Sequence, residues 1–66
     1  MKLYELRRGD RFRIAPEERG EDCEAWVYTF DHVDGAYSVC FAPTEARDVV
    51  HFAAWTPVEK VGEAVP

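Results

Sequence analysis

The sequence predicts a small all-β domain, a five-stranded antiparallel barrel or bent sheet. Three observations support this class: apolar and polar residues alternate in short runs, turn-forming residues separate the runs at close spacing, and the 66-residue chain is 14% aromatic. Alternation with period two is the signature of a half-buried strand, and several short strands separated by turn signals are typical of small barrels. The expected single domain covers residues 1–61, and residues 62–66 are expected to form a frayed tail.

A central β-hairpin is predicted within VYTFDHVDGAYSVCF, residues 27–41, where two apolar runs meet at Asp34-Gly35. Asp-Gly between alternating runs is a strong hairpin signal, because both residues tolerate the positive φ angles that a two-residue type I′ turn needs. The expected loop is therefore the two-residue one, and a three-residue loop with a glycine bulge is the alternative.

The loop length decides which residues of the hairpin face each other. The two-residue loop pairs Val33 with Ala36 and Phe30 with Val39, whereas the three-residue loop places Phe30 opposite Cys40. We favour the first register because it gathers the aromatic side chains on one face of a half-buried ribbon. That face would hold Trp26, Tyr28, Phe30, His32, Tyr37, Val39 and Phe41.

A first strand is expected at residues 11–15, with Phe12 and Ile14 inward, because apolar and polar residues alternate there. Gly9-Asp10 precedes it as a turn. Before that turn, the two leucines of KLYEL are three positions apart, which suits a helical turn that points both of them inward.

Two further strands are expected after the hairpin. Residues 49–55 alternate, with Val50, Phe52 and Ala54 on one side, and residues 58–61 offer a short last strand. Five short strands of this kind suggest an SH3-like barrel first and an OB-like barrel second.

The chain carries a net charge of −5, and its charges are unevenly distributed. Residues 1–13 have five basic and two acidic side chains, whereas residues 14–24 have one basic and five acidic ones. An acidic total disfavours non-specific binding to nucleic-acid phosphates and suits docking onto a basic surface. No apolar run approaches the ~20 residues of a membrane span, and charges interrupt the N-terminal segment where a signal peptide needs an apolar core. We therefore expect a cytoplasmic protein that does not contact a membrane.

The segment EERGEDCE is expected to be an exposed, charged loop. It is either a solvated connection or an acidic surface that occupies a basic groove of a partner. Charge of this kind speeds association and sets specificity. The expected partner-binding residues are Glu17, Glu18, Glu21, Asp22 and Glu24 in this loop, with Asp31 and Asp34 near the hairpin tip.

An arginine strip near the N-terminus gives an alternative site. Beside an aromatic β-surface it could bind single-stranded nucleic acid, with bases stacked on the rings. The competing interpretation is that the aromatic residues form the core and that the arginines pair with the acidic loop. The alternative nucleic-acid face consists of Arg7, Arg8, Arg11 and Arg13.

No motif in the sequence predicts catalysis, a metal site or a cofactor. Cys23, Cys40, His32 and His51 are capable of binding metal, but no pair has the spacing of a zinc motif. Cys40 with either histidine resembles a nucleophile and a base, although a barrel of this size leaves little room for a pocket that excludes water. We expect a protein that is not an enzyme, with both cysteines reduced.

Three aromatic residues are candidates for anchors of a protein interface, because Trp and Tyr are enriched among the residues that dominate binding energy. They are Trp26, Tyr37 and Trp55. We expect Trp55, at the end of its strand, to be partly exposed.

Three segments give the chain a resemblance to a known class of proteins. They are L-x-x-L-x-x-G-D-x-F at residues 3–12, D-G-x-Y-S at 34–38 and VVHFAAWTPV at 49–58. In them the chain resembles small open reading frames of phages and prophages, which are predicted to be compact β-barrels. The resemblance implies a viral protein that binds one host protein, such as a polymerase, a nuclease or a CRISPR effector. It implies no catalytic residues.

The sequence thus predicts a non-enzymatic, phage-type binding module that inhibits or redirects a host protein with a basic surface, as an anti-CRISPR inhibitor does. We expect a monomer or a weak homodimer. A small nucleic-acid-binding barrel is the first alternative. A structural or assembly protein is the second, and it would form stable homo-oligomers.

Overall fold

The computed structural model describes residues 1–15 and 26–63. One antiparallel sheet of five strands organises these residues, in the order β4-β3-β2-β1-β5. The all-β class and the five antiparallel strands are confirmed. The elements are η1 (Leu3–Glu5, a 3-10 turn), β1 (Arg11–Ile14), β2 (Tyr28–Asp34), β3 (Tyr37–Phe41), β4 (Val49–Val50) and β5 (Val58–Gly62).

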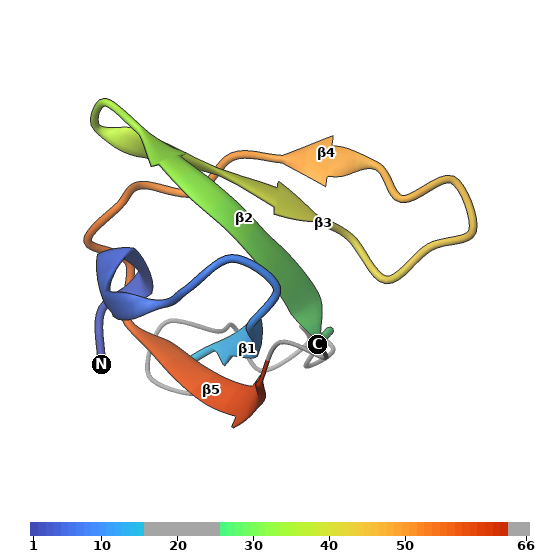
Figure 1. Cartoon of the computed structure of the whole chain (residues 1–66), viewed down its shortest axis with the longest axis horizontal. Coiled ribbons are helices and arrows are strands. Elements are labelled where there is room, and N and C mark those ends of the chain that lie inside the picture. Colours follow the sequence, from blue (N-terminus) through green and yellow to red (C-terminus); the bar gives the residue numbers. More distant parts are fainter. Residues whose placement is uncertain (16–25, 64–66) are drawn as a thin grey trace.

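β2 is the longest strand and the middle of the sheet, with β3 and β4 on one side and β1 and β5 on the other (Figure 1). Each of the first three strands pairs with the next, and β5 then returns to the free edge of β1. The returning chain passes between the hairpin end and η1. There the Ala54 N–H donates to the Ala36 carbonyl oxygen, and the Leu3 N–H donates to the Thr56 carbonyl oxygen, each at 2.9 Å.

The hydrophobic core gathers the inward residues of η1, β1, β2, β3 and β5. Phe12 and Leu3 are fully buried. The ring centroid of Phe12 lies 5.8 Å from that of Tyr28 and 6.2 Å from that of Phe52. The inward positions predicted for Phe12 and for both leucines are confirmed. The buried cluster consists of Leu3, Leu6, Phe12, Phe30, Cys40 and Val58.

The hairpin turn lies one residue later than predicted. Asp34 pairs with Tyr37, so the two loop residues are Gly35 and Ala36 rather than Asp34 and Gly35. Gly35 has a φ of 65°, and Ala36 has no positive φ. This is the pattern of a type II′ turn, which needs positive φ only at its first central residue, where glycine adopts it without steric cost.

A β-bulge at Asp31 then changes the register of the hairpin. His32 pairs with Val39 and Phe30 pairs with Cys40, which leaves Asp31 as the extra residue. The favoured pairing of Phe30 with Val39 is therefore wrong. The Phe30–Cys40 pairing of the alternative register is found, although the extra residue lies within β2 and not in the loop.

β3 buries its small residues and exposes its aromatic end. Ser38 and Cys40 are fully buried, whereas Tyr37 is 58% exposed. The Ser38 hydroxyl donates to the Phe52 carbonyl oxygen at 2.9 Å and accepts the Phe52 N–H at 3.3 Å. These two bonds satisfy a polar side chain inside the core. The predicted grouping of the aromatic side chains on one face of the hairpin is therefore wrong, because Phe30 lies in the core and Tyr37 is exposed.

The strand predicted at residues 49–55 is much shorter in the structure. Regular pairing covers only Val49–Val50, and an isolated bridge joins Tyr37 to Ala53. The chain turns after this bridge to return to the other side of the sheet, which ends the pairing. The last predicted strand is confirmed, and it reaches Gly62, one residue into the expected tail.

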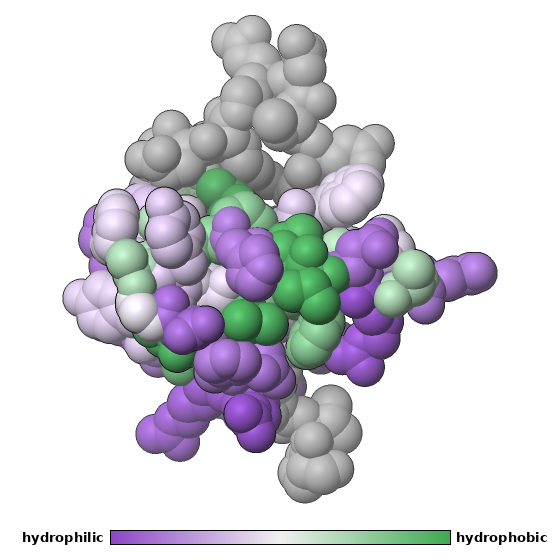
Figure 2. All heavy atoms as spheres, turned by 90° about the horizontal axis from the view of Figure 1, so that it is seen from above, coloured by the Kyte–Doolittle hydropathy of each residue, from purple (hydrophilic) through white to green (hydrophobic). Residues whose placement is uncertain are grey.

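Part of the molecular surface is hydrophobic. Figure 2 shows hydrophobic side chains in the middle of the molecule as seen from above, with hydrophilic ones around them. The Arg47 guanidinium lies over the Phe41 ring, 4.8 Å from its centroid. Arg47 has a φ of 50°, in the left-handed region that ordinary side chains seldom occupy. The loop after β3 thus holds a cation over an aromatic ring of the sheet.

Candidate binding surface

The acidic residues predicted as partner contacts have different positions. Asp34 is exposed at the end of β2. Asp31 is engaged within the molecule, because its carboxylate accepts the Nδ1–H of His32 and lies 3.5 Å from Nε of Arg8. Of these two residues, Asp34 is the more accessible to a partner. The others lie outside the described residues: Glu17, Glu18, Glu21, Asp22 and Glu24.

The four arginines of the alternative nucleic-acid face are divided among different contacts. Nε of Arg13 donates to a Glu59 carboxylate oxygen at 2.6 Å across the β1–β5 pair. Arg8 is paired with the bulge carboxylate. The Arg11 guanidinium packs so closely on Gly62 that a Cβ there would lie 2.7 Å from one of its nitrogens. Three of the four arginines thus contact different residues of the fold, and Arg7 lines a pocket beside the Gly-Asp turn.

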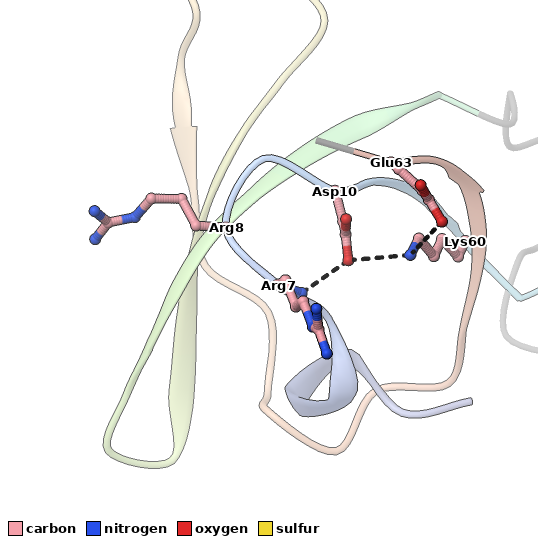
Figure 3. A pocket seen from close by; sticks show the side chains of 5 residues that line it. All are labelled: Arg7, Arg8, Asp10, Lys60 and Glu63. Carbon is pink, nitrogen blue, oxygen red and sulfur yellow. Dashed lines mark hydrogen bonds and ion pairs between the residues drawn. The ribbon is translucent and has the colours of Figure 1, made fainter. Parts of the chain in front are cut away.

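A polar pocket of about 550 Å³ lies beside the Gly-Asp turn (Figure 3). The buried Asp10 carboxylate accepts the Arg7 backbone N–H at 2.8 Å and lies 3.6 Å from Nζ of Lys60. The same Nζ is 3.8 Å from a Glu63 oxygen. Figure 3 shows the Arg8 side chain pointing away from the other four lining residues. The charges of Asp10, Lys60 and Glu63 pair with one another and tie the turn to the end of β5.

Cys40 and the two histidines make contacts within the fold. The Cys40 thiol is free and fully buried. Burial raises the pKa of this thiol, and a hydrogen bond with Ser38 opposes the rise. Nδ1 of His51 donates to the Ser38 carbonyl oxygen at 2.9 Å. A buried, protonated thiol is a poor nucleophile, and the described residues contain no group of three or more side chains placed to hold a metal ion.

Three large aromatic side chains are mostly exposed on the described part of the molecule. Tyr4 is 57% exposed, Tyr37 58% and Trp55 59%. They belong to segments far apart in the sequence, namely η1, the start of β3 and the turn before β5. We call these three residues the aromatic surface.

Backbone hydrogen bonds hold the three segments of the aromatic surface together. The Tyr4 N–H donates to the Ala54 carbonyl oxygen at 2.9 Å, and the Ala54 N–H donates to the Ala36 carbonyl oxygen. On the other side of Ala36, Tyr37 forms the isolated bridge with Ala53. The turn that carries the tryptophan therefore lies between η1 and the hairpin end, at the left of Figure 1. Side chains of intermediate hydropathy, drawn pale, gather on the same side in Figure 2.

The sequence identified part of this surface. Trp55 is exposed, as predicted. Tyr37 was one of the predicted anchors, although the predicted register placed it on the same face of the hairpin as Phe30. Tyr4 was not predicted. Its exposure could have been inferred from Leu3 and Leu6, because two inward leucines three positions apart leave Tyr4 on the outer side of the turn. The third predicted anchor, Trp26, is 44% exposed, with its ring centroid 6.4 Å from that of Tyr28.

Comparison with protein-family models, with curated proteins and with solved structures finds no match for the chain. Among the described residues, none forms a helix with the length and hydropathy needed to cross a membrane. The function is therefore inferred from the geometry and the charge of the described surface.

Proposed function

We propose that the chain is a non-enzymatic binding module that docks onto another protein through the aromatic surface. The observation that carries this proposal is the joint exposure of Tyr4, Tyr37 and Trp55 on three hydrogen-bonded segments. Tyr and Trp side chains supply most of the binding energy in many interfaces. Each combines a large apolar area with a polar group that can hydrogen-bond at the rim of the contact.

The exposure of these rings is costly for so short a chain. A chain of this size buries only about 60% of the surface that its unfolded form exposes. Each Å² of apolar surface removed from water contributes about 25 cal/mol. Three of the nine aromatic side chains nevertheless stay mostly in water. A partner that covers these rings would remove their apolar surface from water. A group of exposed aromatic side chains on a small domain usually marks such a binding site.

The scaffold suits a binding role. The first four strands are neighbours in chain order, and β5 lies beside β1. We expect this order of an SH3-like barrel, which we propose as the fold, with an OB-like barrel as the second choice. Small barrels of these kinds carry many unrelated functions, so the surface and not the fold supports the proposal. The aromatic residues stand on hydrogen-bonded backbone, which lowers the entropy cost of ordering them in a complex.

The partner that we propose is a host protein with a basic surface, which the module inhibits or redirects, as the phage-type resemblance implies. The net charge of −5 and the exposed Asp34 beside Tyr37 support an acidic contact of this kind. We propose as further contacts of this partner the acidic residues expected from the sequence: Glu17, Glu18, Glu21, Asp22 and Glu24.

Affinity capture with matched baits tests the proposal. The baits are the full wild-type chain, a Tyr37→Ala/Trp55→Ala double variant, and Val61→Ala as the control. Val61 is 43% exposed on β5, at the other side of the sheet. We expect the wild-type chain and the control to retain one bacterial protein after nuclease treatment, and the double variant to lose it while melting at the wild-type temperature.

Two results would contradict the proposal. Equal capture by the folded double variant would mean that the aromatic surface is not the contact. Capture that disappears on nuclease treatment would favour the nucleic-acid alternative.

A further inference from the structure

An exposed carboxylate lies beside one ring of the aromatic surface. Asp34 lies directly opposite Tyr37 in the β2–β3 pair, so their side chains share one face. Glu5 follows Tyr4 in η1, and its carboxylate accepts the Lys2 backbone N–H at 2.6 Å. The turn segment 53–56 has no charged side chain, and Lys2 directly precedes η1. A partner segment that covers Tyr37 therefore meets the Asp34 carboxylate at the edge of the contact.

A second copy of this chain is a poor occupant of such a surface. In a two-fold dimer the same patch meets itself, which would bring Asp34 and Glu5 of both copies toward each other. Like charges facing each other across an interface oppose association, and each copy has a net charge of −5. Charge complementarity therefore favours a positively charged partner.

The molecule itself contains one contact between an arginine and an aromatic ring. The Arg47 guanidinium lies over the Phe41 ring, 4.8 Å from the centroid. A guanidinium group is planar and weakly hydrated, so it stacks on an aromatic face and still donates hydrogen bonds at its edge. From the described residues, Tyr37 and Trp55 receive no cation of this kind. A stacking cation for these rings would have to come from a partner.

We propose that the aromatic surface recognises an extended, arginine-bearing segment of the partner protein. The arginine side chain stacks on Tyr37 or Trp55, and the Asp34 carboxylate accepts hydrogen bonds from the edge of the guanidinium. This inference rests on the proposed function and adds the chemistry of the segment that the module binds.

A titration with a matched pair of peptides tests the inference. The probe is a short peptide of alternating arginine and proline, and the control replaces each arginine by citrulline, which keeps the side-chain shape and removes the charge. The backbone amide and indole N–H signals of the full chain show where each peptide binds. We expect the arginine peptide to shift the signals of Tyr4, Tyr37 and Trp55. We expect the citrulline peptide to bind at least about threefold more weakly.

Two matched variants distinguish recognition from general attraction to an acidic chain. Asp34→Asn removes the carboxylate beside Tyr37 and should weaken binding of the arginine peptide by about two- to fivefold. Glu45→Gln removes an exposed carboxylate from the loop after β3 and should leave the affinity unchanged.

Each contrary result has a defined meaning. Equal affinity for the two peptides at the aromatic surface would overturn the arginine preference and leave the proposed function intact. Equal losses in Asp34→Asn and Glu45→Gln, shifts confined to other parts of the chain, or no shifts at all would overturn the inference in the same way. A folded Tyr37→Ala/Trp55→Ala bait that keeps the captured protein, or capture that disappears on nuclease treatment, would overturn the proposed function itself.

Discussion

Phe30 lies opposite Cys40 because Asp31 is an extra residue in β2. Without this bulge, the pairing at the hairpin end would continue so that Phe30 faced Phe41, which lies on the outer face of β3. The bulge turns Phe30 into the core, where it is 4% exposed beside the fully buried Cys40. One inserted residue thus decides which face of β2 carries the aromatic side chain.

The two phenylalanines of the hairpin should therefore respond differently to truncation. Phe30→Ala should lower the free energy of unfolding by about 3–5 kcal/mol, which is most of the stability of so small a domain. Phe41→Ala should cost less than about 2 kcal/mol, because Phe41 is only partly buried. Urea and thermal melts measure both values. Equal melting of the two variants would mean that the faces of β2 and β3 are wrongly assigned.

The buried carboxylate of Asp10 should contribute to stability. It accepts the Arg7 N–H and pairs with Lys60. Asp10→Asn should lower the free energy of unfolding by about 1–3 kcal/mol, because the neutral amide loses the ion pair with Lys60 from a buried position. Glu63→Gln is the matched control, since this carboxylate pairs with the same Lys60 but is 86% exposed, and its loss should be small. An Asp10→Asn variant with the wild-type free energy of unfolding would show that the ion pair in the pocket is not needed for stability.

The Cys40 thiol should make the protein less stable at alkaline pH. Burial raises the pKa of Cys40 in the folded state, so the native protein keeps a proton that the unfolded chain has already released. The free energy of unfolding should therefore fall as the pH rises from the ordinary thiol pKa toward the raised one. Melts across this pH range measure the slope.

Cys40→Ala provides the comparison for this slope. The variant should be less stable at neutral pH, because it leaves a cavity in the core. Its stability should nevertheless fall less steeply at alkaline pH. Parallel slopes in the two proteins would assign the alkaline loss to other groups.

The hairpin turn depends on the backbone conformation of Gly35. Its φ is 65°, and no atom lies within 4 Å of the position that a Cβ would take. Gly35→Ala therefore tests conformation alone and should cost about 1–2 kcal/mol. Ala36→Gly, at the other loop residue, should cost about 0.5 kcal/mol. The reverse order of the two losses, measured by denaturant melts, would exclude the type II′ turn.

Much of the fold could be predicted from local patterns. The period-two alternation of residues 11–15 and 58–61 and the Gly-containing loop of the hairpin specify strands whatever their partners are. The bulge could not be predicted, because Asp31 is an ordinary residue and its insertion leaves the strand composition unchanged. The burial of Ser38 also escaped prediction, since the group that satisfies its hydroxyl is Phe52, fourteen positions along the chain.

The aromatic surface could be predicted only in part, for a related reason. Exposure of Trp55 followed from its place at a strand end. The exposure of Tyr37 depends on the turn position and on the bulge, which together set the β3 face. The approach of Tyr4 to the same region depends on hydrogen bonds between η1 and the segment 53–56. Such contacts between distant segments leave no periodic signal in the sequence.

The fluorescence of Trp55 in a Trp26→Phe variant tests the central claim most directly. The chain has two tryptophans, so this variant leaves Trp55 as the only indole, on the aromatic surface itself. The titrant is the protein retained by affinity capture. We predict that its binding shifts the emission to shorter wavelength and protects the indole from acrylamide quenching, because the ring leaves water. Unchanged emission and quenching in a complex that demonstrably forms would contradict the claim that the aromatic surface is the binding site.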